Sequence, residues 1–376
     1  MCNVRRIKMK IMYICGMYVP SHGGAEISMY SLLKNLKEKF NWEVLSVTDE
    51  RYTETKINDN FNKVPIRTVN HSNRLNEIDT AITEFNPDII MTQLMWSDIA
   101  LKLAKKYSIP SIMRVCKVPL ELDLSMNSKI SPTAIISTSN SVKKYVKKKW
   151  NRKSEIIKPL IEIENYIIID NTFKPIKNKL IFMFNPLKRK GGLILKEISK
   201  RLPEQKFGTV YGWSSLKENK NSKYFSSEYI ERITESEGCK FDGSLPDYIS
   251  FRDCNNIKIF KPEDDPKKIY EKIKILIIPS QWEEAFGRVS IEAMANGIPV
   301  IASNIAGLKD AVGEGGILLE KDDIKSWIEE IKKLNKENKY YKMWSKKGKE
   351  FVKKNYSEKK ILIDFIKLVK SISKKD

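Results

Sequence analysis

The sequence has few of the features that mark a secreted or membrane-spanning protein. Its five cysteines, at positions 2, 15, 116, 239 and 254, are odd in number and form no C-x-x-C pair, so they indicate neither a disulfide framework nor a zinc site. The apolar run at residues 11–15 is too short for the core of a signal peptide. No run approaches the roughly 20 apolar residues of a spanning helix. We therefore expect a cytoplasmic protein, with peripheral contact at the inner face of the membrane as an added alternative.

Acidic residues and histidines are also scarce relative to the basic residues. The chain of 376 residues has 68 Lys and Arg, 47 Asp and Glu and 2 His, for a formal net charge of +21. Such a charge favours an anionic partner: nucleic acid, an acidic membrane or a phosphorylated substrate. The lysine bias runs through the whole chain, so a compositional origin without any partner is an equal alternative. Nucleic-acid binding would need a known motif or aromatic residues among the basic ones, and the sequence shows neither. We therefore predict no nucleic-acid partner.

The length suggests two domains, and the hydrophobic pattern gives each the same architecture. Short β-branched runs alternate with helical stretches, which is typical of α/β domains with a parallel, doubly wound sheet. We predict an N-terminal domain over residues 1–170, a C-terminal domain over 171–355 and a final helical segment over 356–376 that packs back on the N-terminal domain. Ligands of such sheets bind beyond the carboxyl ends of the strands, here in a cleft between the domains. The predicted strands are residues 10–15, 42–47, 89–92, 111–115, 134–137, 180–184, 206–211, 257–260, 275–278, 300–303 and 316–319.

The most informative stretch is residues 279–300, which reads as a loop, a helix and the start of a strand. Gly287 opens the helix and Gly297 ends it. Unpaired N–H groups and the positive dipole at the helix N-terminus suit a diphosphate. Glu284 and Glu292 bracket this anion site, about 12 Å apart if the spacing were all helix. Each carboxylate could accept hydrogen bonds from hydroxyl groups, one on either side of the diphosphate. A nucleotide-sugar has this layout of ribose, diphosphate and sugar. The alternative is two ordinary acids near a helix start.

The full string resembles the retaining glycosyltransferases of family 4, which have the two-domain GT-B fold. Their signature is a Pro-Ser pair followed by E-x-F-G-x-x-x-x-E-A-x-A-x-G-x-P-V. The resemblance implies that Glu284 binds the donor sugar and Glu292 the ribose. It also implies that the backbone at Phe286, Gly287 and Arg288, with Val289 beside it, contacts the sugar and the phosphates. The matching residues are Pro279, Ser280, Glu284, Phe286, Gly287, Glu292, Ala293, Ala295, Gly297, Pro299 and Val300.

A second glycine-rich loop, at residues 20–26, follows the first predicted strand. Its paired Gly23 and Gly24 allow a close approach of the backbone to a ligand and an anion-binding turn before a helix. In the family this loop lies across the cleft, near the phosphate and the acceptor. The alternative is a plain turn between strand and helix. His22, in the same loop, is a candidate for the acceptor side, against an ordinary surface histidine.

The loop at residues 184–192 resembles the family's Lys-Gly loop, whose lysine binds the diphosphate. Lys190 takes that place, and a cation there would stabilise the leaving group without a metal. The family commonly has an arginine where this chain has Asn185, and Lys188 or Arg189 could supply the charge instead. The alternative for these two residues is a solvated surface patch. Many members have a cleft histidine where this chain has Cys116, with Arg114 nearby. We therefore do not assign a histidine general base from that strand.

These motifs together predict a retaining glycosyltransferase that uses a UDP- or GDP-sugar, with Glu284 and Lys190 as the catalytic residues. The expected acceptor is a saccharide or a lipid-linked molecule in surface polysaccharide or glycolipid synthesis. We expect the acceptor to enter from the N-terminal domain and the nucleotide-sugar to bind mainly to the C-terminal domain. Attack on the front face, with the departing diphosphate taking the acceptor proton, suits a site without a nucleophile and base pair. We expect no cofactor and no metal. The alternatives are a catalytically silent binding protein of the same fold and a basic nucleic-acid-binding protein.

The stretch at residues 141–154 carries seven basic residues and no acid. Val142, Tyr145, Val146 and Trp150 form an apolar stripe along it at helical spacing. An interfacial helix that binds anionic lipid headgroups would have this pattern. The favoured alternative is a surface helix whose apolar stripe faces its own core.

Overall fold

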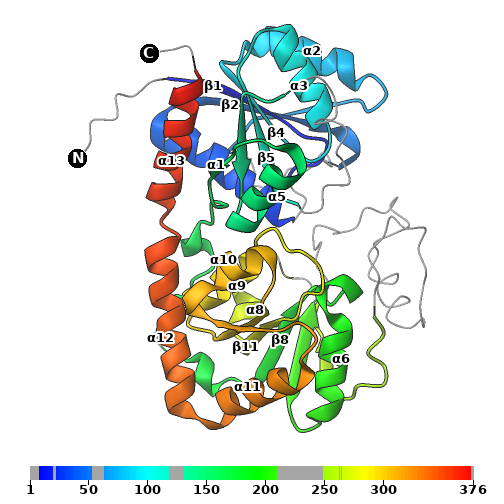
Figure 1. Cartoon of the computed structure of the whole chain (residues 1–376), viewed down its shortest axis with the longest axis vertical. Coiled ribbons are helices and arrows are strands. Elements are labelled where there is room, and N and C mark those ends of the chain that lie inside the picture. Colours follow the sequence, from blue (N-terminus) through cyan, green and yellow to red (C-terminus); the bar gives the residue numbers. More distant parts are fainter. Residues whose placement is uncertain are drawn as a thin grey trace. The chain divides into compact units, whose positions relative to one another are not determined.

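The computed structural model of the chain contains two β-sheets, each built of parallel strands and covered by helices on both faces (Figure 1). The structure describes residues 8–19, 23–52, 63–117, 131–170, 172–210, 249–261, 263 and 265–373. The chain divides into two units, Met1–Ile161 with Tyr356–Asp376 and Glu162–Asn355, and each is described by itself.

The first unit has a seven-stranded sheet in the order β3-β2-β1-β4-β5-β6-β7, with every neighbouring pair parallel. Along β1 the side chains alternate between two cores. Ile11 and Tyr13 pack with α1 and α13, while Met12 and Ile14 pack with α2 and α3. This period of two follows from the pleat, and burial on both faces explains the continuous apolar runs. The strands are β1 (Lys10–Ile14), β2 (Glu43–Asp49), β3 (Ile66–Val69), β4 (Ile89–Gln93), β5 (Ser111–Val115), β6 (Ala134–Ser137) and β7 (Glu155–Ile156), and the helices are α1 (Gly24–Phe40), α2 (Arg74–Phe85), α3 (Ser97–Lys106), α5 (Asn140–Trp150) and α13 (Glu358–Ile372).

Helix α13 comes from the far end of the chain and lies beside α1 (Figure 1). Its apolar face enters the same core as α1, where the ring of Phe365 lies 6.5 Å from that of Trp42. The Ser357 side chain accepts a hydrogen bond from the backbone N–H of Lys360, which caps the helix N-terminus. The buried residues of α13 are Ile361, Leu362, Phe365, Ile366 and Val369.

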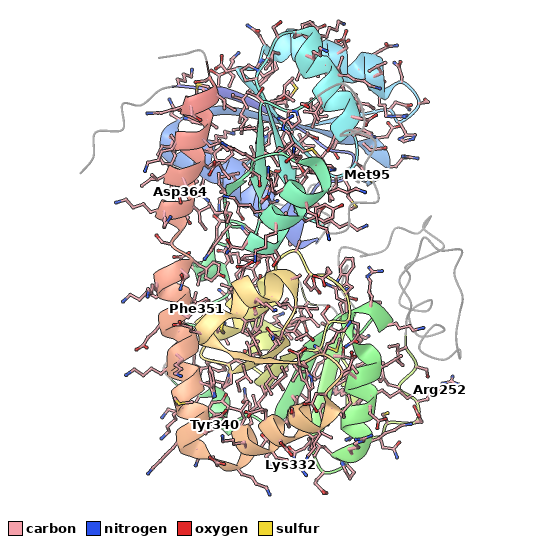
Figure 2. The ribbon with its side chains drawn as sticks, viewed as in Figure 1. Met95, Arg252, Lys332, Tyr340, Phe351 and Asp364 are labelled. Carbon is pink, nitrogen blue, oxygen red and sulfur yellow. The ribbon has the colours of Figure 1, made fainter. Side chains whose placement is uncertain are left out.

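The second unit has a six-stranded parallel sheet in the order β10-β9-β8-β11-β12-β13. Trp327 of α11 is fully buried, and its ring N–H donates to the Glu320 carbonyl at 3.0 Å. Figure 2 shows Phe351 on α12. Its side chain lies so close to Gly313 and Gly315 that a Cβ on either residue would come within 2.7 Å of it. The elements are β8 (Leu180–Phe184), β9 (Lys206–Val210), β10 (Ile257–Ile259), β11 (Ile273–Ile278), β12 (Val300–Ser303), β13 (Ile317–Leu319), α6 (Gly192–Arg201), α8 (Lys267–Tyr270), α9 (Arg288–Ala295), α10 (Ala306–Val312), α11 (Ile324–Lys336) and α12 (Asn338–Asn355).

Both sheets reverse their strand order at one point, between β1 and β4 and between β8 and β11. In a doubly wound sheet the ligand crevice lies outside the carboxyl ends of the strands at this switch point. The loops after β8 and β11 are therefore the first place to examine in the second unit.

Two strands of the first sheet, β3 and β7, were not predicted. They have four and two residues, lie outside the central strands and include charged side chains. These short strands form by pairing with the longer β2 and β6, and the pattern of residues within a strand does not report such a partner. The predicted domain boundaries and the roles given to the two domains stay predictions. Within the described residues, every helix is too short or too polar to cross a bilayer.

Candidate active site

The two loops that carry Lys190 and Glu284 meet at the switch point of the second sheet. They follow β8 and β11, which are parallel neighbours, so their carboxyl ends lie at the same edge. The backbone N–H of Gln281 donates to the Arg189 carbonyl at 2.9 Å and joins the loops. Gly191 has φ +93°, and a Cβ on it would lie 1.9 Å from the Pro279 carbonyl oxygen. A glycine is therefore required for this close approach.

Lys190 and Glu284 form a largely buried ion pair. The Lys190 Nζ donates to Glu284 Oε1 at 2.5 Å, and the Ser280 hydroxyl donates to the same oxygen at 2.9 Å. The Glu284 side chain is 9% exposed and that of Lys190 is 24% exposed. Burial alone would raise the pKa of Glu284, but Lys190 and Ser280 outweigh it and the pKa is lowered. The site therefore holds an ionised carboxylate next to a cation.

The ring of Trp282 contacts two basic side chains of the loop after β8. The Arg189 Cζ lies 5.1 Å and the Lys190 Nζ 5.2 Å from the centre of its ring, within the range of cation–π attraction. Asn185 stands at the start of the same loop with φ +55°, and its backbone N–H donates to the Val210 carbonyl at 2.7 Å. The loop thus presents basic side chains beside Glu284.

Helix α9 begins where the loop after β11 ends, and its N-cap residue is a glycine, which has no side chain to cap the first N–H groups. Its N-cap, Gly287, has φ +106°, and a Cβ there would lie 2.5 Å from a methyl carbon of Leu308. The Gly307 N–H donates to the Glu284 carbonyl at 2.7 Å, which fixes the loop from its other side. Phe286 is buried and Arg288 and Val289 form the first turn, so this end of α9 has the geometry of an anion site.

Glu292 lies one turn further along α9 in a buried polar network. The Tyr270 hydroxyl donates to Glu292 Oε2 at 2.6 Å, and Arg288 Nε donates to Glu292 Oε1 at 3.2 Å. Arg288 Nη2 in turn donates to the Tyr166 hydroxyl at 2.9 Å. Arg288 Nη1 is buried and has no hydrogen-bond partner in the part of the chain that the structure describes. The network therefore holds a carboxylate and an incompletely satisfied guanidinium together.

One strand away from the switch point of the first sheet, Arg114 of β5 is buried with most of its donors engaged. Its Nη1 donates to Gln93 Oε1 at 2.8 Å and its Nη2 to the Ser28 hydroxyl at 2.8 Å. The Cys116 thiol lies 3.8 Å from the same oxygen of Gln93. Burial raises the pKa of Cys116 to about 11, so the thiol is protonated at neutral pH. Arg114 thus ties the first turn of α1 to β4.

The paired glycines border α1, with Gly23 as its N-cap and Gly24 as its first residue. A Cβ on Gly23 would lie 1.9 Å from Glu26 Oε2, so the missing side chain makes room for that carboxylate. Glu26 is 3% exposed, and burial raises its pKa. His22 lies outside the described residues.

Five residues of these networks were not singled out by sequence reasoning: Glu26, Ser28, Gln93, Tyr166 and Tyr270. Glu26 follows the paired glycines, and that position could have drawn attention to it. Tyr166 and Tyr270 are distant from Glu292 in the chain and carry no motif, so only the tertiary structure reveals them.

Comparison with known proteins points to one family. A family model described as "Glycosyl transferases group 1" matches residues 254–351. The capsular polysaccharide biosynthesis glycosyltransferase CapM of Staphylococcus aureus is 39% identical over 90 residues, which are 23% of this chain and 23% of that protein. A D-inositol 3-phosphate glycosyltransferase of Corynebacterium urealyticum is 37% identical over 76 residues, 20% of this chain and 18% of that protein. The matches to these curated relatives thus span less than a quarter of their length.

Solved structures match over nearly the whole chain. A glycosyltransferase from Rickettsia africae has a TM-score of 0.76 at 19% identity, over 98% of this chain and 100% of that one. Anabaena Alr3699/HepE, solved in complex with UDP-glucose, has a TM-score of 0.74 at 14% identity, over 96% of this chain and 100% of that one. At such identities the likeness establishes the fold. The predicted GT-B fold is confirmed, and so is the family predicted from the motif at residues 279–300.

Proposed function

Since this chain is a group 1 glycosyltransferase by family and has the GT-B fold, we propose that it transfers a sugar from a nucleotide-sugar to an acceptor hydroxyl with retention of configuration. The observation that carries the proposal is the Lys190–Glu284 pair at the switch point, beside the N-terminus of α9. A UDP-sugar is favoured over a GDP-sugar, because HepE, which shares the fold, was solved with UDP-glucose.

The ion pair suggests how the donor is received. Without donor, Lys190 and Glu284 satisfy each other's charge. A bound diphosphate would attract the Lys190 ammonium, which leaves Glu284 free to accept a hydrogen bond from a hydroxyl of the donor sugar. Lys190, the α9 N-terminus and Arg189 would then stabilise the negative charge that develops on the leaving diphosphate. We propose front-face attack: the acceptor oxygen bonds to the anomeric carbon as the bond to the diphosphate breaks, and the diphosphate takes the acceptor proton.

For the acceptor we propose a saccharide or a lipid-linked molecule of surface polysaccharide synthesis, supported by the similarity to CapM. Contact with an anionic membrane stays a prediction. In α5 the side chains of Val142 and Val146 are buried, while Lys143 and Lys144 are exposed. This arrangement supports the interpretation that the valines face the unit's own core and leaves a basic outer face. Sedimentation with phosphatidylglycerol vesicles, compared with phosphatidylcholine vesicles, would test the contact.

The proposed function is tested first by thermal shift with a panel of UDP- and GDP-sugars, since specific binding raises Tm by mass action. With the donor found, slow release of the nucleoside diphosphate shows turnover. Glu284→Ala should abolish transfer in a folded protein, and Lys190→Ala should weaken donor binding. Full activity of Glu284→Ala would refute the assignment. A catalytically silent protein would release no diphosphate, and a nucleic-acid-binding protein would bind DNA in a salt-dependent way that nucleotide-sugars do not alter.

A further inference from the structure

Both carboxylate oxygens of Glu292 are held by the protein itself. Oε2 accepts from the Tyr270 hydroxyl at 2.6 Å and Oε1 from Arg288 Nε at 3.2 Å. An ionised carboxylate has about four acceptor sites, about two on each oxygen. With the partners that the described part of the chain supplies, one site on each oxygen stays available, and the carboxylate cannot turn without losing a bond. A carboxylate with one acceptor site left on each oxygen matches a pair of adjacent hydroxyl groups.

The guanidinium that holds Oε1 is held in its turn by Tyr166. Arg288 Nη2 donates to the Tyr166 hydroxyl at 2.9 Å, and Arg288 Cζ lies 5.7 Å from the centre of the Tyr166 ring. The Arg288 and Glu292 side chains are only 9% and 8% exposed. In such a site hydrogen bonds are little weakened by water. Removal of the Tyr166 hydroxyl should therefore loosen Arg288 and, through it, Glu292.

Asn296, at the other end of α9, fixes the segment that carries Tyr166. Its Nδ2 donates to the Tyr166 carbonyl and to the Glu292 carbonyl, each at 2.9 Å. Its Oδ1 accepts from the backbone N–H of Ile168 at 2.9 Å. One amide side chain thus clamps residues 166–168 along the helix that bears Glu292.

The two tyrosine hydroxyls stay protonated across the physiological range. Burial, and then the Glu292 charge, raise the pKa of Tyr270, while burial raises that of Tyr166 to about 12. The Tyr270 hydroxyl keeps the proton that it donates to Glu292 Oε2, and the Tyr166 hydroxyl accepts from Arg288 Nη2.

We infer that Tyr270, Tyr166 and Asn296 are positioning residues that orient Glu292 so that its two remaining acceptor sites receive the adjacent hydroxyls of a ribose. The inference rests on the proposed function, which supplies the nucleotide. These residues do not touch the nucleotide themselves; they act through Glu292 and Arg288. Their loss should therefore lower the selectivity for ribose over deoxyribose, and not only the stability of the unit.

The test is a set of calorimetric Kd values for UDP, GDP and ADP and for the 2′-deoxy form of whichever binds. A hydrogen bond to a charged group that is lost on deoxygenation corresponds to about a 10- to 100-fold weaker affinity for wild type. Tyr270→Phe should reduce this ratio to within about threefold of one, and Tyr166→Phe and Asn296→Ala should reduce it in part. In a Glu292→Ala background the same changes should have no further effect on the ratio.

Matched controls separate positioning from general destabilisation. Tyr341→Phe removes another buried hydroxyl, which donates to the Lys274 carbonyl at 2.8 Å. Asn256→Ala removes another amide clamp, which donates to the Ser199 and Leu202 carbonyls. Both controls should lower Tm and keep the wild-type ratio.

The outcomes distinguish the inference from the proposed function. If wild type binds none of the three diphosphates, the proposed function fails and the inference fails with it. If wild type binds a diphosphate without preference for ribose, or keeps its preference in Tyr270→Phe, the inference is wrong while the function stands. Should Tyr270→Phe not fold, Tyr166→Phe tests the opposite oxygen of Glu292, and an unchanged ratio there overturns the inference.

Discussion

Replacement of Lys190 by Met should turn the Glu284 carboxylate from a stabilising into a destabilising group. Met fills a similar volume without the charge and leaves Glu284 only 9% exposed beside Ser280. Removal of one partner from a buried ion pair costs about 3–5 kcal/mol. Because the Lys190 side chain is 24% exposed and partly hydrated, we expect a smaller loss, about 2–3 kcal/mol at pH 8. In a unit of this size that corresponds to a Tm lower by about 4–12 °C.

The pH dependence of the loss follows from the sign of the pKa shift. In wild type the pKa of Glu284 is lowered, so its stabilising contribution is present above the unfolded pKa of about 4.3 and is lost as the pH falls through the folded pKa. In the variant, burial without Lys190 should raise the folded pKa above the unfolded one. The carboxyl is then harmless when protonated and costs stability as the pH rises. The deficit should therefore be small at pH 4 and full at pH 8.

Urea unfolding at several pH values measures the free energy of unfolding and its pH dependence. It is applied to wild type, Lys190→Met, Glu284→Gln and the double variant. The double variant removes both charges and should recover most of the lost stability, which gives a coupling energy of about 1–3 kcal/mol. The control is Lys325→Met, which breaks an exposed pair with Glu329 at 3.9 Å and should change stability by less than about 0.5 kcal/mol. A deficit independent of pH, or a coupling energy near zero, would refute the reasoning.

Three further predictions concern the loop, the core and the metal requirement. Gly191→Ala should lower stability by at least about 2 kcal/mol and weaken donor binding, because φ is +93° and the new methyl would meet the Pro279 carbonyl oxygen; an unchanged Kd would contradict this. Phe365→Ala should destabilise the first unit by about 3–5 kcal/mol in urea unfolding, because its buried ring packs near Trp42; a loss under about 1 kcal/mol would show that α13 contributes little. Chelation with EDTA should leave the rate of transfer unchanged, and a loss restored by Mg²⁺ or Mn²⁺ would show that a metal takes part in holding the diphosphate.

The central strands and the α9 motif could be predicted because their signals are local. A strand buried on both faces is mostly apolar along its length. Residues 180–184 meet that condition from end to end, and residues 111–115 and 134–137 meet it except at Ser111, Arg114 and Ser137. The motif residues around Gly287 lie close together in the sequence, in one loop and the helix that follows it, so their spacing can be recognised without knowledge of the fold. By contrast, β3 and β7 depend on a partner strand, and a periodic pattern does not report a partner.

The sequence by itself determined which residues carry charge, which loops follow the strands and which family the motif at residues 279–300 resembles. Only the tertiary structure decided that Glu284 pairs with Lys190, 94 positions away, and that Glu292 is held by Tyr270 and, through Arg288, by Tyr166. The reason is that a local pattern reports which side of an element is buried and not what covers it. What covers it depends on the strand order, which brings β8 and β11 together at the switch point across nearly a hundred residues of chain.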